Sequence, residues 1–431
     1  MLRILHLIPG TGGTFYCENC LRDASLVQGL RQIGHDVVMV PMYLPILFEE
    51  PGVDGQVPVF FGAINVYLKQ ISKFYRHVPR WVERVFDTSG LLKLVAKNTG
   101  STSAHGLEEM TLSMLRGEHG NQASELDAFI RWIKTQEKPH AVHLSNALLL
   151  GMARRIKHEL DIPIICSLQD EHTWLDQMKA SWAKQIWDTM IDRGRDVDAY
   201  ITVSSYYADI MQQRMQIPDD RLHIIPAGVN LDGFHQASLD LNPPIIGYLS
   251  RICATHGLDI LVEAFIQLRK NKKLRHTQLH ITGGQLGEDK AFIRSLKKKL
   301  QTCNCQNEVH VYSEFDRPRR LEFLQSLSVL SVPMHEPEAL GLFQLEAMAA
   351  GVPVVQPRIG GFTELIEATG GGILYEPNNP ATLAVVLEDL LLDQQRLKAL
   401  GNKGHTAVVN SFSHLHMAEK VAAVYEKVKG K

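Results

Sequence analysis

The 431-residue sequence has little of what marks several large protein classes. Six cysteines in a chain of this length do not make a disulfide framework. Its 45 Lys and Arg against 47 Asp and Glu leave no chain-wide field for nucleic acid. No stretch approaches the roughly 18 uninterrupted apolar residues that a membrane-spanning helix needs. What remains, 45% hydrophobic and 21% charged residues, is typical of a globular protein of two domains.

The start of the sequence and its two close cysteine pairs favour neither a targeting segment nor a metal site. Residues 1–9 form an apolar run that is too short for a signal peptide and leads into glycines. We therefore expect a cytoplasmic protein that could rest on the inner face of a membrane. The pairs Cys17/Cys20 and Cys303/Cys305 lie far apart in the chain, so a shared zinc site would need distant segments to converge. We expect buried or loop thiols, no metal and no cofactor.

The stretch from His335 to Pro353 organises the second half of the chain. It follows an apolar run that reads as a buried strand, and it precedes a second one. Residues 341–350 have a helical pattern, and Gly351 with Pro353 ends the helix. Glu346 is the single charge on this apolar helix, so it must face a partner or a polar crevice.

Glu338 stands eight positions before Glu346, in the loop that leads into the helix. The two carboxylates can lie about two turns apart along one wall. Between them the first amides of the helix attract phosphate. This arrangement suits a nucleotide-activated sugar, with hydroxyls at each end and a diphosphate between them. The alternative is a pair of solvated glutamates near a helix end.

The stretch resembles the E-x(7)-E signature of the retaining glycosyltransferases of family 4 (group 1). The resemblance implies a GT-B fold of two Rossmann-like, doubly wound α/β domains that face each other across a cleft. It also implies that Glu338 contacts the transferred hexose, that Glu346 contacts the donor ribose, and that the amides of Leu340, Gly341 and Leu342 help to hold the diphosphate.

The N-terminal region reads as the start of a doubly wound unit. Residues 2–8 form an apolar strand, a glycine turn follows, and a helix is expected from about 17 to 33. Gly12 and Gly13 let the backbone come close to a phosphate or sugar. They resemble the family's N-terminal glycine loop.

Residues 58–120 depart from the alternation of strand and helix. Within them, residues 66–97 carry seven basic side chains against two acidic ones, interleaved with apolar residues at roughly helical spacing. Such a segment could lie on an anionic membrane or bind an anionic acceptor. The alternative is a packed helix with a solvated basic face.

Polar residues follow two further predicted strands of the first domain. Ser145 and Asn146 follow one, and Gln169, Asp170 and Glu171 follow the next. These strand ends should open into one crevice, so we expect an acceptor site there. Asp170, Glu171 and His172 are candidates for orienting or deprotonating an acceptor hydroxyl. The family usually has a histidine where Ser145 and Gln169 stand, and a loop that caps the next helix is the alternative.

The second domain opens with a strand that ends at Arg251, and His256 follows five residues later. The family has Arg-x(4)-Lys here, and both cations hold the donor diphosphate. A neutral imidazole carries no full charge, so we expect weaker diphosphate binding or a pH dependence around neutrality. Gly283 and Gly284 form a further turn that can approach the diphosphate or base. For Arg251 the alternative is a surface ion pair.

Together these observations predict three parts. They are an acceptor-side domain over 1–238 with the basic insertion, a donor domain over 239–411, and a returning helix over 412–431. The predicted reaction is metal-independent transfer of a hexose from a nucleotide-diphosphate sugar to a glycan, lipid-linked or small-molecule hydroxyl, with retention. Glu338, Arg251, His256, Asp170 and Glu171 are its candidate catalytic residues. A nucleotide-sugar epimerase of the same fold and a non-catalytic nucleotide-sugar-binding protein are the alternatives. The base, sugar and acceptor stay open.

Overall fold

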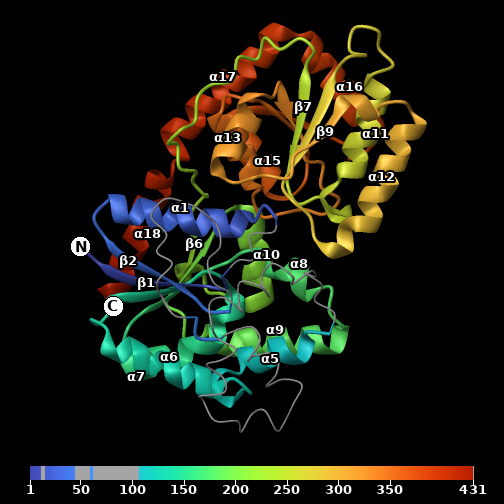
Figure 1. Ribbon diagram of the computed structural model, residues 1–431. Coiled ribbons are helices and arrows are strands. Elements are labelled where there is room, and N and C mark those ends of the chain that lie inside the picture. The colour runs from blue at the N-terminus through green and yellow to red at the C-terminus, as the bar shows by residue number, and fades with distance from the viewer. Residues whose placement is uncertain (11–14, 44–58, 62–105, 431) are drawn as a thin grey trace. The chain divides into compact units, whose positions relative to one another are not determined.

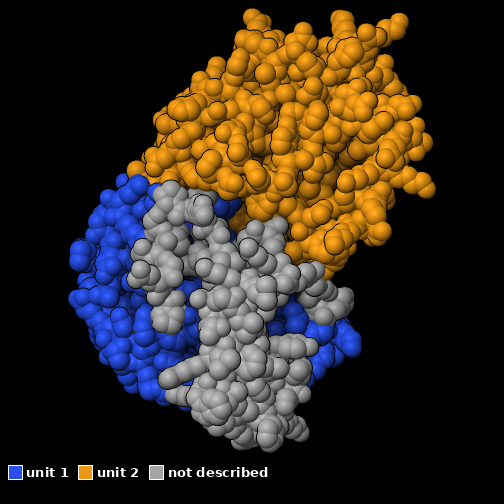
Figure 2. Space-filling model, in the orientation of Figure 1, with its two compact units in different colours: residues 1–13, 19–226, 417–431 blue, residues 14–18, 227–416 orange. Residues whose placement is uncertain are grey.

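A computed structural model describes residues 1–10, 15–43, 59–61 and 106–430 of the chain. It divides into two compact units, coloured separately in Figure 2. Unit 1 comprises residues 1–13, 19–226 and 417–431, and unit 2 comprises residues 14–18 and 227–416. The main division lies at 226/227, twelve residues before the boundary that the sequence predicts. Residues 14–18 were not expected to belong with the second unit.

The described part of unit 1 holds a six-stranded parallel sheet in the order β2-β1-β3-β4-β5-β6. Parallel strands buried on both faces require nearly continuous apolar runs, and β1 and β3 have runs that are each interrupted by one buried histidine, His6 and His143. The order changes direction between β1 and β3, where consecutive strands leave on opposite sides. The strands are β1 (Arg3–Ile8), β2 (Asp36–Pro41), β3 (Ala141–Leu144), β4 (Ile164–Ser167), β5 (Ala199–Thr202) and β6 (Leu222–Ile224).

Helices cover this sheet, and Figure 1 shows α5 and α9 running side by side, in agreement with their contacts. The last helix, α18, contributes residues 417–429 to unit 1, where the buried Tyr425 hydroxyl lies 2.6 Å from His143 Nδ1 of β3. The helices are α1 (Glu18–Gln32), α5 (Glu108–Leu115), α6 (Ala123–Thr135), α7 (Ala153–Leu160), α8 (Glu171–Leu175), α9 (Ala180–Gly194), α10 (Ser205–Met215) and α18 (His414–Lys429).

Unit 2 holds the second six-stranded parallel sheet of the described residues, in the order β12-β11-β10-β7-β8-β9. Its direction changes between β7 and β10. Two parallel sheets with helices confirm the predicted α/β class with two Rossmann-like parts. The strands are β7 (Ile245–Leu249), β8 (Gln278–Thr282), β9 (Val309–Val311), β10 (Val329–Leu330), β11 (Val354–Pro357) and β12 (Gly372–Tyr375).

The helices of unit 2 include α14, the predicted buried helix, in which every residue is buried. Among the helices that the structure describes, none combines the length and the apolar character needed to cross a membrane. The helices are α11 (Leu258–Leu268), α12 (Lys290–Thr302), α13 (Arg317–Gln325), α14 (Leu342–Ala349), α15 (Gly360–Thr369), α16 (Pro380–Leu392) and α17 (Gln394–Ser411).

Candidate active site

The point where the strand order of unit 2 reverses gathers most of the predicted donor residues. In open parallel sheets, ligands bind beyond the carboxyl ends of the strands at such a point. Arg251 follows β7, and the loop that carries Glu338 follows β10. Gly283 and Gly284 follow the neighbouring strand β8. The topology therefore brings three segments that are distant in sequence to one edge of the sheet.

Helix α14 begins at this edge. Its first turn is preceded by Gly341, whose φ of 78° lies in the left-handed region. A Cβ atom there would come within 2.6 Å of the Phe362 ring, so only glycine fits. The backbone amide of Leu342, the first helical residue, donates a hydrogen bond to the Glu18 carboxylate. The amino end of α14 therefore holds an anion, and this anion belongs to the chain itself.

Glu346 lies one turn further along α14 and is only 4% exposed. Arg320 Nε donates to one of its oxygens at 2.8 Å, and the Tyr16 hydroxyl donates to the other at 2.7 Å. Burial and the nearby carboxylate raise the pKa of Tyr16 well above its usual value, so the phenol stays protonated and donates. The sequence predicts that this buried carboxylate faces a partner or a polar crevice. The structure shows two partners, the Arg320 guanidinium and the Tyr16 hydroxyl.

Arg320, Tyr16 and Glu18 were missed by the sequence analysis. For Arg320 a signal existed, because the buried residues of α13 are Arg320, Phe323 and Leu324, which share one helical face. A cation on the buried face of one helix and a carboxylate on an apolar helix predict an ion pair. Tyr16 and Glu18 carry no such signal, because more than 320 residues separate them from their partners.

Glu338 and His256 approach each other beside α14. The Glu338 side chain is 24% exposed, and one of its oxygens lies 4.0 Å from His256 Nε2. His256 Nδ1 lies 2.8 Å from the Ser250 hydroxyl. Burial, aided by the charge of Arg251, lowers the pKa of His256 to about 4. The imidazole is therefore neutral at neutral pH, which argues against the predicted pH dependence around neutrality, while the weaker diphosphate binding stays a prediction.

Arg251 is held by two carboxylates. Its guanidinium donates to Asp289 at 3.0 and 3.1 Å and to Glu288 at 2.6 Å. The same group lies 5.7 Å from the centre of the Phe15 ring. Arg251 therefore forms the ion pair that was the alternative to a diphosphate contact. This pair does not lie at the surface as that alternative supposed, because the Arg251 side chain is only 13% exposed.

The Gly283–Gly284 turn makes the close backbone approach that its glycines allow. A Cβ atom on Gly283 would meet the Ser250 carbonyl oxygen at 2.2 Å. The backbone that comes close is again the chain's own: the Tyr16 amide donates to the Gly283 carbonyl at 2.7 Å, and Phe15 forms an isolated bridge with Gly284.

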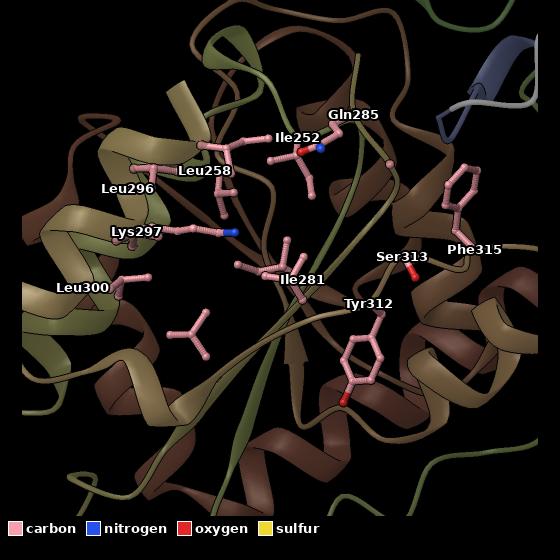
Figure 3. Close-up of a pocket in the computed structure, with 15 residues that line it drawn as sticks. Ile252, Leu258, Ile281, Gln285, Leu296, Lys297, Leu300, Tyr312, Ser313 and Phe315 are labelled. Atoms are coloured by element: carbon pink, nitrogen blue, oxygen red, sulfur yellow. The ribbon is translucent and has the colours of Figure 1, made fainter. Parts of the chain in front are cut away.

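A cavity of about 340 Å3 adjoins this turn in unit 2 (Figure 3). Its walls are mainly apolar side chains of α11, α12 and the sheet, including Leu258, Leu296 and Ile281. Ser313 and Phe315 lie at the side where the loop after β9 passes.

In unit 1, Glu171 is a buried carboxylate that receives only neutral donors. It accepts hydrogen bonds from the amides of Ala147 at 2.7 Å and Gln169 at 2.8 Å, and from the Tyr207 hydroxyl at 2.5 Å. It is 2% exposed. These contacts join the segment after β3 to the segment after β4, so Glu171 fixes the two loops. Its predicted role as a base toward an acceptor does not fit this burial.

The other predicted acceptor residues divide by exposure. Ser145 is fully buried, and the Gln169 side chain donates to Asp23 at 3.0 Å inside unit 1. Asn146 and Asp170 are partly exposed. The Asn146 side chain accepts from the Leu148 amide at 3.1 Å. Asp170 adopts a left-handed conformation with φ of 56°.

Comparisons with known proteins place these features in a family. The model of "Glycosyl transferases group 1" matches residues 233–407, and that of "Glycosyltransferase Family 4" matches residues 110–232. The chain belongs to glycosyltransferase family 4. A D-inositol 3-phosphate glycosyltransferase of Xylanimonas cellulosilytica is 29% identical over 221 residues, 48% of this chain and 51% of that protein. The chain thus spans about half the length of several curated relatives that it matches.

Two further similarities extend over more of the chain. An alpha-maltose-1-phosphate synthase of Mycolicibacterium smegmatis is 26% identical over 70% of this chain and 83% of its own length. The structure of a sucrose-phosphate synthase from Thermosynechococcus elongatus superimposes with a TM-score of 0.72 over 100% of both chains at 18% identity. At that identity the superposition shows the fold, which is GT-B.

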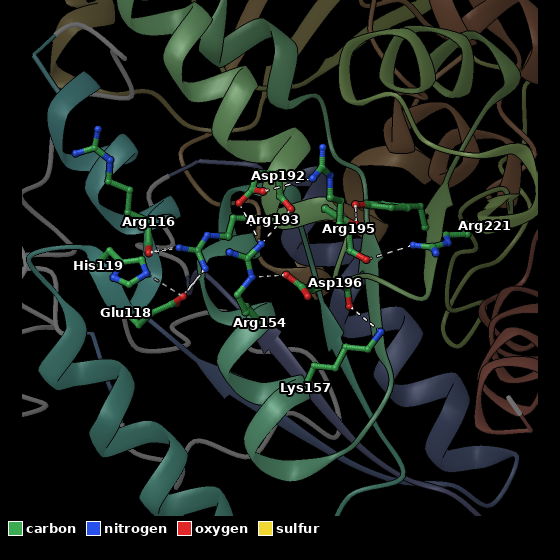
Figure 4. A network of polar contacts seen from close by, with 12 residues as sticks. Arg116, Glu118, His119, Arg154, Lys157, Asp192, Arg193, Arg195, Asp196 and Arg221 are labelled. Atoms are coloured by element: carbon green, nitrogen blue, oxygen red, sulfur yellow. Dashed lines mark hydrogen bonds and ion pairs between the residues drawn. The ribbon is translucent and has the colours of Figure 1, made fainter.

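Several predictions on this family 4 chain fall on other parts of the molecule. Gly12, Gly13, the basic segment 66–97 and most of the insertion 58–120 lie outside the described residues. Asp196 pairs with Arg154 at 2.9 Å (Figure 4), and Asp198 pairs with Lys157 at 2.7 Å. Within the described ranges, no group of three His, Cys, Asp or Glu side chains is arranged to hold a metal.

The expectation of thiols is wrong for one of the two cysteine pairs. All six cysteines lie within the described residues, and Cys166, Cys253, Cys303 and Cys305 are free. Cys17 and Cys20 are disulfide-bonded, and because the other four are free, they bond to each other. The disulfide lies at the start of α1, and Glu18 is part of the short loop that it closes.

Proposed function

We propose that this family 4 protein transfers a hexose-type sugar from a nucleotide-diphosphate sugar to an acceptor hydroxyl, with retention. One observation supports the proposal most: the amino end of α14 binds a carboxylate between Glu338 and Glu346. A site that holds a carboxylate through a backbone amide and a helix dipole has the chemistry for a phosphate. The donor diphosphate would lie there, near Arg251 and His256.

The proposed reaction needs no nucleophile from the protein. The acceptor oxygen forms a bond to the anomeric carbon while the bond to the leaving phosphate oxygen breaks, and the acceptor proton passes to that diphosphate on the same face of the sugar. The protein contributes stabilisation of the leaving charge and orientation. The amides of Leu340, Gly341 and Leu342, together with Arg251, would stabilise the negative charge on the leaving diphosphate. Glu338 would hold the hexose, and the base would lie against Ser313 and Phe315.

On the acceptor side we propose Asn146 and Asp170, because both are partly exposed and Glu171 is not. Two of the relatives are named for a phosphorylated small polyol or sugar, D-inositol 3-phosphate and maltose 1-phosphate. We therefore propose a small phosphorylated acceptor as the first class to test, ahead of glycans and lipid-linked acceptors. Contact of residues 66–97 with an anionic membrane stays a prediction that co-sedimentation with anionic liposomes at low salt checks.

The test has a binding step and a turnover step. UDP, GDP and ADP are titrated calorimetrically, and the sugar conjugates of the base that binds are incubated with an acceptor panel while nucleoside diphosphate release is measured. We expect one base to bind and Glu338→Gln to reduce turnover more than binding. Conversion of the donor without any acceptor would favour the epimerase, and binding without turnover would favour the binding protein. The absence of binding by every nucleotide, both to the protein with its disulfide intact and to the reduced protein, would refute the proposal.

A further inference from the structure

Four consecutive residues, 15 to 18, occupy the predicted donor site of unit 2, to which they belong. The Glu18 carboxylate sits on the Leu342 amide at the start of α14, where a phosphate would bind. The Tyr16 hydroxyl sits on Glu346, where the resemblance implies a ribose hydroxyl. The segment therefore places a carboxylate on the Leu342 amide, which is expected to bind a donor phosphate. It places a hydroxyl on Glu346, which is expected to bind a donor ribose hydroxyl.

Backbone and ring contacts hold the same segment against the other donor residues. Tyr16 donates its amide to Gly283, Phe15 bridges Gly284, and the Phe15 ring lies beside the guanidinium of Arg251. Arg320 lies 5.8 Å from the centre of the Tyr16 ring and binds the same carboxylate as its hydroxyl. The contacts of residues 15–18 thus follow the donor site from the glycine turn to α14.

A disulfide closes the part of the chain that contains Glu18. Glu18 lies between Cys17 and Cys20 in the chain, and their disulfide closes a ring of four residues that includes Glu18. A covalent ring restricts the conformations that the released segment could adopt, so less entropy is gained when Glu18 leaves Leu342. Opening the ring raises that entropy and weakens the hold of the segment on the site.

We propose that residues 15–18 are an internal substitute for the nucleotide-sugar donor, and that the Cys17–Cys20 disulfide holds this autoinhibitory contact in place. A dithiol reductant would open it: the S–S bond breaks, two electrons and two protons pass to the two cysteine thiols, and the reductant becomes a disulfide. The donor then competes with a more weakly held segment. This proposal rests on the proposed function, because it requires a nucleotide to bind at α14.

The experiment is calorimetric titration of UDP, GDP and ADP into wild type, Glu18→Gln and Tyr16→Phe. Glutamine keeps a carbonyl for the Leu342 amide but loses the charge, so nucleotide binding should tighten about tenfold, the factor expected when one charge-assisted hydrogen bond is weakened. Tyr16→Phe should tighten binding to a smaller degree. Glu322→Gln, which removes an exposed charge on α13, is the matched control and should leave affinity unchanged.

The role of the disulfide is tested by the same titrations before and after treatment with dithiothreitol. Thiol counting should find four thiols before the treatment and six after it. Reduction should tighten nucleotide binding in wild type and have no effect in Cys17→Ser/Cys20→Ser, which should bind as the reduced protein does. Unchanged affinity on reduction overturns the role of the disulfide. Unchanged or weaker binding by Glu18→Gln overturns the autoinhibitory contact while the proposed function stands. If no nucleotide binds any variant in either state, both proposals fail.

Discussion

Each unit contains a buried glutamate at the carboxyl edge of its sheet, and the two are held in different ways. In unit 2, Glu346 is paired with the buried guanidinium of Arg320 and with Tyr16. In unit 1, Glu171 accepts from two backbone amides and from Tyr207. Glu346 depends on one cation from another helix, whereas Glu171 fixes the loops that follow two strands. A buried glutamate therefore links helices α13 and α14 in unit 2, and it fixes the loops after β3 and β4 in unit 1.

The largest effect should come from removing the cation in unit 2. Arg320→Leu leaves the Glu346 charge buried without its ionic partner, which costs about 3 to 5 kcal/mol of the free energy of unfolding. Urea denaturation followed by tryptophan fluorescence and far-UV circular dichroism measures this loss. Arg320→Leu combined with Glu346→Gln should recover part of it, because no isolated charge remains. A loss below about 1 kcal/mol would mean that solvent already reaches the pair.

The corresponding change in unit 1 should cost less. Glu171→Gln keeps one acceptor oxygen but places an amide donor against groups that are themselves donors, which costs about 1 to 3 kcal/mol. Tyr207→Phe removes one of the three donors to the carboxylate and also the acceptor of the Glu171 amide, and it should cost about 1.5 to 3 kcal/mol. The same denaturation experiment reports both. If Glu171→Gln instead left stability unchanged and abolished turnover, Glu171 would be a base toward the acceptor, as the sequence suggested.

The comparison also shows what sequence can predict about such sites. The apolar surroundings of Glu346 required a buried partner, and the pattern of α13 contained it, so this ion pair was within reach of sequence reasoning. Glu171 was assigned to the acceptor from its position after a strand. Position after a strand places a residue at the correct edge, but it does not reveal whether neighbouring amides will enclose its side chain.

The contacts of residues 15–18 with the proposed donor site were beyond the sequence for a different reason. The alternation of strands and helices, the glycine turns and the E-x(7)-E spacing are local patterns, and they predicted both sheets and the edge where the donor residues meet. The contacts of Tyr16 and Glu18 are made with residues more than 320 positions away. Neither side chain has a periodicity or spacing that identifies such a partner.

The smallest expected effect is a pH dependence shared by the two units. Burial lowers the pKa of His256 to about 4 in unit 2 and lowers the pKa of His143 well below 6.5 in unit 1. Between pH 6.5 and 4 the unfolded chain therefore binds more protons than the folded chain. Stability from both histidines is fully present above about pH 6.5 and is lost as the pH falls toward 4.

Thermal unfolding at pH 7.5, 6.0 and 5.0 tests this expectation and compares the two units again. His256→Gln should flatten the pH dependence, because glutamine can still contact the Ser250 hydroxyl and does not titrate. His158→Gln, at an exposed position of α7, is the control and should leave the slope unchanged. His143 lies between Tyr425 and the Ser167 hydroxyl at 2.6 and 2.9 Å, so its protonation strains the contact between α18 and β3 as well. If the slope in His256→Gln equalled that of wild type, the acid sensitivity would belong to unit 1 and its helix α18.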